Sequence, residues 1–130
     1  MRFDDVKVEV VRILKTAQGR FLSAYQICQR LQVAAPGLWA RLVKEYPSVD
    51  AGTPMGERTG KQYSPATFVA NALNYFVQAD EVAGLTKEVF ECDGVSFGDI
   101  TPGFTGNVVG IWAIKDDHEM TETPANPAEG

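Results

Sequence analysis

The stretch RFLSAYQICQRL, residues 20–31, constrains the fold more than any other part of the chain. Ser23 followed three residues later by Gln26 is the pattern of a capping box, in which two side chains bind backbone N–H groups at the start of a helix. The apolar residues that follow recur at helical spacing. The stretch therefore predicts a helix over residues 24–32, and residues 20–22 are the candidate for a short strand that leads into it.

Three other segments carry apolar residues at helical spacing, at residues 4–18, 36–46 and 64–77. The first contains VKVEVV, which also alternates as a strand does, but its length and the Gly19 that follows it favour a helix. In the last segment Ser64 suits the position of the N-cap. The residues expected to meet in the core are Val10, Leu14, Ile27, Cys28, Leu31, Phe68, Leu73 and Phe76.

The C-terminal part of the chain changes character. LTKEVFEC and VVGIWAIK are rich in residues that favour strands, and residues 93–107 between them are rich in Gly, Pro, Asn and Asp. This pattern predicts a β-hairpin with a long connection, with a further short strand at residues 95–97 as an option. We therefore expect an α+β fold, mainly helical in its N-terminal part, that forms one domain over residues 1–115. Residues 116–130 are predicted to be a disordered acidic tail.

The expected element order is helix, short strand, three helices and a hairpin, and it resembles the winged-helix variant of the helix-turn-helix class. The resemblance covers roughly residues 4–115 in element order, and its most specific piece is FLSAYQICQRL leading into another helix. It implies a winged-helix-like domain. The chain departs from the compact pattern because residues 33–63, with a helix of their own, precede the helix before the hairpin.

Two helices compete for the role of a recognition helix. Helix 64–77 directly precedes the predicted hairpin, which fits the topology of a wing. Alternatively, residues 24–46 form the helix-turn-helix themselves and expose Arg41 and Lys44, which fits the short turn of that motif better. We prefer helix 64–77 because of its place before the hairpin.

Composition and charge narrow the classes of function. Hydrophobic residues make up 45% of the 130 residues and no apolar run is long enough to span a bilayer, so we expect a cytoplasmic protein with no membrane contact. Cys28 and Cys92 lie far apart and are expected to be reduced core thiols. The first 79 residues carry a net charge of +4 and the remainder −9. Such a division is typical of a nucleic-acid-binding face with an acidic tail, and equally of a soluble surface.

DNA binding is the first functional hypothesis. Thr67, Asn71 and Asn74 form an uncharged polar face on helix 64–77, and side chains of this kind read base edges. Arg58 and Lys61, just before the helix, would contact phosphates. Against this, helix 64–77 contains no Lys or Arg, and residues 93–107 contain two acids and no basic residue.

A protein-interaction module is the alternative hypothesis. Phe97, Ile100 and Phe104 lie in the long connection of the hairpin. Exposed aromatic residues on a loop suit a protein partner or a second copy of the chain. The same three residues would instead complete the core if the connection folds back over the sheet.

Catalysis finds little support in the sequence. His118 lies in the acidic tail, where DDHE is a poor metal site, and Ser23 and Ser64 suit helix caps rather than nucleophiles. GERTGKQ, residues 56–62, falls one residue short of the phosphate-loop spacing and has Gln62 in place of Ser or Thr. We expect no enzymatic activity, no cofactor and no bound metal.

Overall fold

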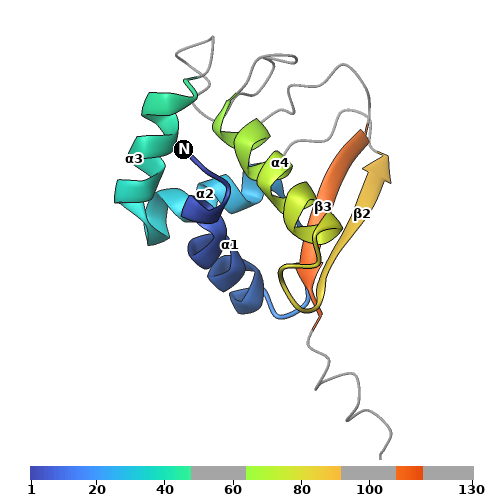
Figure 1. The fold of residues 1–130 in the computed structure, drawn as a ribbon. Coiled ribbons are helices and arrows are strands. Elements are labelled where there is room, and N and C mark those ends of the chain that lie inside the picture. Colours follow the sequence, from blue (N-terminus) through green and yellow to red (C-terminus); the bar gives the residue numbers. More distant parts are fainter. Residues whose placement is uncertain (48–63, 92–107, 116–130) are drawn as a thin grey trace, which may run out of the picture.

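A computed structural model describes residues 1–47, 64–91 and 108–115 of the chain. The described part is an α+β fold, as the sequence predicts, and it has four helices and a three-stranded antiparallel sheet (Figure 1). The sheet has the order β1-β3-β2, so β3 is its central strand. The elements are α1 (Asp4–Thr16), β1 (Leu22–Ser23), α2 (Ala24–Ala34), α3 (Pro36–Glu45), α4 (Pro65–Gln78), β2 (Leu85–Glu91) and β3 (Val108–Ile114).

The capping box ties the start of α2 to the sheet. The Ser23 hydroxyl accepts a hydrogen bond from the backbone N–H of Gln26 at 3.2 Å, and the Gln26 side chain accepts one from the backbone N–H of Ser23 at 2.9 Å. Ser23 also ends β1, where it pairs with Ile111 of β3. One residue therefore fixes both where the helix begins and where β1 meets the sheet.

The core lies where α1, α2 and α4 turn their apolar faces toward one another and toward β3. All the core residues expected from helical spacing are buried, Phe68 to 2% and Phe76 completely. Trp112 and Ile114 extend the core into the sheet. The ring of Phe68 stacks on Tyr46 at 4.7 Å between centroids and also contacts Phe3.

Helix α3 packs mainly on α2 and joins the core through Leu42, with Leu38 and Trp39 partly buried against it. Leu42 is its one fully buried residue among those described. Its C-terminal end is held to the N-terminus of the chain, because the Met1 amino group pairs with Glu45 at 2.6 Å and the Tyr46 hydroxyl donates to the Met1 carbonyl. Figure 1 shows α3 and the β2–β3 hairpin at opposite sides of the molecule, with α4 between them.

Several element boundaries differ slightly from those predicted. Helix α1 ends at Thr16 rather than at residue 18, because Gln18 and Gly19 adopt positive φ angles of 58° and 85°. The first strand begins at Leu22 rather than at Arg20, whose backbone N–H still bonds to the Ala17 carbonyl of the preceding turn. The optional short strand at residues 95–97 and the predicted tail 116–130 lie outside the described residues, as does Cys92.

None of the described helices is long and apolar enough to cross a bilayer. Cys28 is buried in the core, in line with a core thiol.

Candidate binding face of helix α4

The side chain of Ser64 caps the N-terminus of helix α4. Ser64 lies just before the helix, and its hydroxyl accepts a hydrogen bond from the backbone N–H of Thr67 at 3.3 Å. The Thr67 hydroxyl lies 3.0 Å from the same Ser64 oxygen. Pro65 occupies the first helical turn, where its missing N–H costs nothing. Thr67, one of the three predicted polar contacts, thus takes part in the cap and is half-buried.

The other two predicted polar residues of α4 lie in different environments. Asn71 is exposed to solvent, next to the partly exposed Tyr75 one turn further along the helix. Asn74 is half-buried, and its Oδ1 atom is sealed from solvent with no hydrogen-bond partner among the described residues. Thr67, Asn71 and Asn74 thus differ in exposure, but all three line one pocket.

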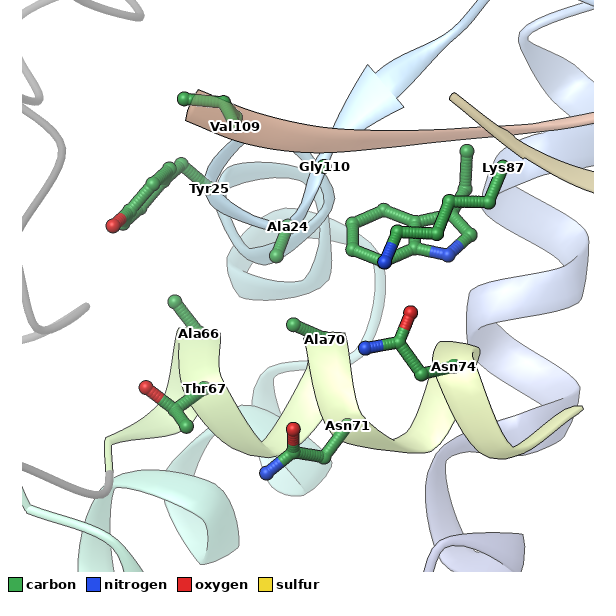
Figure 2. Close-up of a pocket in the computed structure, with 11 residues that line it drawn as sticks. Ala24, Tyr25, Ala66, Thr67, Ala70, Asn71, Asn74, Lys87, Val109 and Gly110 are labelled. Carbon is green, nitrogen blue, oxygen red and sulfur yellow. The ribbon is translucent and has the colours of Figure 1, made fainter. Parts of the chain in front are cut away.

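Asn74 lines a pocket of about 290 Å³ between α4, the start of α2 and the two long strands (Figure 2). Small residues form much of its wall. Figure 2 shows Ala66 and Ala70 pointing from α4 toward β3, and Ala24 pointing from α2 toward α4. Because these side chains are single methyl groups, a gap remains between the helix and the sheet.

The sheet contributes the polar part of the pocket. Lys87 of β2 pairs directly with Trp112 of β3, and the Lys87 ammonium lies 5.5 Å from the centroid of the indole ring. Trp112 is only 2% exposed, and its Nε1 has no hydrogen-bond partner among the described residues. A Cβ atom at Gly110 would lie 3.0 Å from the Trp112 ring and 3.3 Å from the Lys87 side chain. The absence of a side chain at Gly110 therefore provides the space that the Trp112 ring and the Lys87 side chain occupy.

Sequence reasoning missed the residues that the sheet brings to this pocket. Gly110 and Trp112 are distant from α4 in the chain, and no motif links them or Lys87 to it. A signal was present in VVGIWAIK, where Gly110 and Trp112 fall on one face of the same strand.

The predicted cationic residues are not gathered at α4 in the described structure. Arg41 of α3 is exposed and lies 3.7 Å from Asp5, and Lys44 is exposed in the last turn of the same helix. Arg58 and Lys61 lie outside the described residues. Two described cations lie near α4: Lys87 lines the pocket with Asn71 and Asn74, and the Lys7 ammonium lies 5.4 Å from the centroid of the Phe76 ring.

A second surface feature lies on β2. This strand pairs with β3 on one side and is an edge of the described sheet. Val89 and Phe90 near its end are 58% and 46% exposed. Phe97, Ile100 and Phe104, the aromatic and aliphatic contacts predicted in the following connection, lie outside the described residues.

No group of three or more His, Cys, Asp or Glu side chains comes together within the described ranges. No protein-family model, curated protein or solved structure matches the chain.

Proposed function

We propose that the protein is a non-catalytic binding domain that contacts DNA through the outer face of α4. The observation that carries this proposal is the position of Asn71. It is an exposed, uncharged side chain with both donor and acceptor groups, on the helix that directly precedes the hairpin. Asn in this setting suits the reading of an adenine edge in the major groove.

Packing favours α4 over α3 as the contact helix. Helix α4 buries its apolar face against α1 and α2, as Phe68, Val69, Leu73 and Phe76 are all buried, so its outer face is held rigidly. Helix α3 buries only Leu42 in the described structure. The element order supports a winged-helix-like arrangement in which α3 is an additional helix between α2 and α4.

A mobility-shift titration against random duplex DNA at two salt concentrations tests the proposal. Wild-type protein should retard the duplex at low salt, and the retardation should weaken as salt rises because phosphate contacts release counterions. The Arg58→Ala and Lys61→Ala variants should bind all sequences more weakly and flatten the salt dependence.

Base reading is tested separately, on a site selected from random duplexes by repeated binding. Asn71→Ala should weaken binding to the selected site by roughly 1–3 kcal/mol and leave binding to random duplex unchanged. Thr16→Ala, which replaces an exposed polar residue of α1, is the control and should change neither. Absence of any retardation by wild type at low salt and micromolar protein would exclude the DNA proposal.

Protein binding through the β2 edge is the second candidate function. The exposed Val89 and Phe90 favour it, since apolar residues on an edge strand suit pairing with another chain. The predicted contacts Phe97, Ile100 and Phe104 follow this strand directly in sequence. If the wild-type protein sediments as a dimer, Phe90→Ser should return it to a monomer, whereas Asn71→Ala should leave the dimer intact.

A further inference from the structure

The two most exposed large apolar side chains among the described residues lie on helices α1 and α2. Val33, near the end of α2, is 85% exposed, and Val8 of α1 is 66% exposed. Valine is β-branched and a poor helix former, so helix propensity does not favour it at an exposed helical position. Neither side chain belongs to the described core. Single exposed apolar residues are ordinary, so the informative question is whether these two share one surface.

Two adjoining hollows place both valines on one surface. The first has a volume of about 430 Å³, lies between α1 and α2 and includes Val33. The second has a volume of about 400 Å³, follows α1 and includes Val8. Arg12 and Thr16 line both hollows, so the two are continuous. We call the combined surface the α1–α2 groove, and its apolar members are Val8, Val11, Ile13, Val33 and Ala34.

The polar part of the α1–α2 groove is positively charged. Arg12, Lys15 and Arg30 line it, and all three are exposed. Arg12 pairs with Glu9 at 2.6 Å, whereas no ion pair to Lys15 or Arg30 occurs within residues 1–47, 64–91 and 108–115. Residues 10–44 contain six Lys or Arg and no Asp or Glu, although the chain as a whole has a net charge of −5. A negatively charged partner would therefore meet an excess of positive charge here.

We propose that the α1–α2 groove binds an acidic amphipathic helix of a partner protein. The apolar side of that helix packs on Val8 and Val33, and its acidic flanks pair with Lys15 and Arg30. The apolar lining favours such a peptide over a nucleic acid, whose backbone would use the cations but leave the valines against charged phosphates. This binding goes beyond the proposed contact with DNA, because no residue of the groove belongs to α4.

The length of the groove suits a short helix. From Val8 to Thr16 the groove follows α1 for about 12 Å, at 1.5 Å per residue. This distance is about two turns of a bound helix, which is enough for apolar side chains at i, i+4 and i+7 to contact the groove.

A designed peptide provides the probe. It is a fluorescently labelled helix of about four turns, with leucine at helical spacing on one side and glutamate at the remaining positions. One control peptide has lysine in place of every glutamate. A second has the composition of the probe in an order that gives no leucine face. Fluorescence anisotropy measures the affinity of each peptide for the full chain.

The acidic peptide should bind wild-type protein at least about tenfold more tightly than either control peptide. Val33→Ser should weaken binding about fivefold, because an apolar contact is lost. Arg30→Glu should weaken it about tenfold, and rising salt should reduce that difference. Lys44→Glu on α3 is the matched control, because it makes the same change of charge outside the groove and should alter affinity by less than about twofold. Circular dichroism checks that each variant remains folded.

Four results of the peptide measurements would each overturn the proposal. The first is no binding of the acidic peptide at millimolar concentration. The second is equal affinity of wild-type protein for the acidic peptide and either control peptide. The third is an equal effect of Arg30→Glu and Lys44→Glu. The fourth is peptide binding only after residues 118–130 are deleted, which would make the acidic end of this chain the occupant.

Two further results would assign the groove to another class of partner and also overturn the proposal. If Val33→Ser leaves peptide affinity unchanged while Arg30→Glu weakens binding to random duplex DNA, the groove is a nucleic-acid surface. If the protein sediments as a dimer that Val33→Ser dissociates, the occupant is a second copy of the chain.

Discussion

At the scale of single residues, Phe68 joins the helical core to the N-terminal segment. It is 2% exposed, stacks on Tyr46 and contacts Phe3. Phe68→Ala should lower the free energy of unfolding by about 3–5 kcal/mol, because it removes the buried ring and leaves a cavity. Urea denaturation measures the change. Asn71→Ala on the exposed face of the same helix should change the free energy of unfolding by less than about 0.5 kcal/mol. A loss below 1 kcal/mol for Phe68→Ala, on the order of a surface substitution, would contradict its place in the core.

Residue-level reasoning predicts which side of α4 is apolar but not what lies beside its polar side. Helical spacing puts Thr67, Asn71 and Asn74 on one face, and no charge or motif separates them. The difference in exposure arises because the sheet lies beside one edge of α4, where Lys87 of β2 and Trp112 of β3 line the same pocket as Asn74, which is half-buried, and Asn71, which is exposed. Such a difference depends on contacts between distant parts of the chain, which spacing within one helix does not encode.

At the scale of secondary-structure elements, the turn between α4 and β2 depends on Gly84. Its φ is +80°, its carbonyl accepts a hydrogen bond from the Lys115 N–H at 2.8 Å, and a Cβ atom there would lie 2.1 Å from the Lys115 carbonyl oxygen. Gly84→Ala should therefore lower the free energy of unfolding by more than about 3 kcal/mol, from backbone strain together with a clash that separates the turn from the end of β3.

Gly19 provides the matched comparison for this turn. Its φ is +85°, but a Cβ atom there would meet nothing within 4 Å. Gly19→Ala should cost only the strain of the left-handed conformation, about 1–2 kcal/mol. Thermal and urea unfolding of the two variants separate strain from clash. Equal losses would show that the contact with Lys115 relaxes without cost.

The elements themselves follow closely from local chemistry. The capping box of α2 and the Ser64 cap of α4 are both formed, since each needs only residues three positions apart. The pairing of β1 with β3 had no comparable signal, because Leu22–Ser23 is two residues long and its partner is far along the chain. Local patterns thus predict where helices begin better than they predict which strands meet.

At the scale of the whole molecule, the charge of the chain is divided between a positive N-terminal part and a strongly negative C-terminal part. In the described structure four cations are already paired with acids, namely Arg2, Lys7, Arg12 and Arg41. The number of basic side chains free to contact a nucleic acid is therefore smaller than the number of basic residues in the sequence. Exposed pairs of this kind contribute little to stability and are screened by salt.

Deleting residues 118–130 tests how the negative charge acts. The deletion removes three glutamates and brings the formal net charge from −5 to −2. Because this segment has no aromatic or branched aliphatic residue, the thermal midpoint should change by less than about 2 °C.

Under the DNA proposal, the same deletion should strengthen binding to random duplex at low salt, because negative charge near the phosphates is removed. The gain should vanish at high salt. Calorimetry and the mobility-shift titration measure the two effects. A large drop in the thermal midpoint would show that these residues pack on the domain. Weaker DNA binding after the deletion would contradict the prediction that the negative charge of residues 118–130 repels DNA.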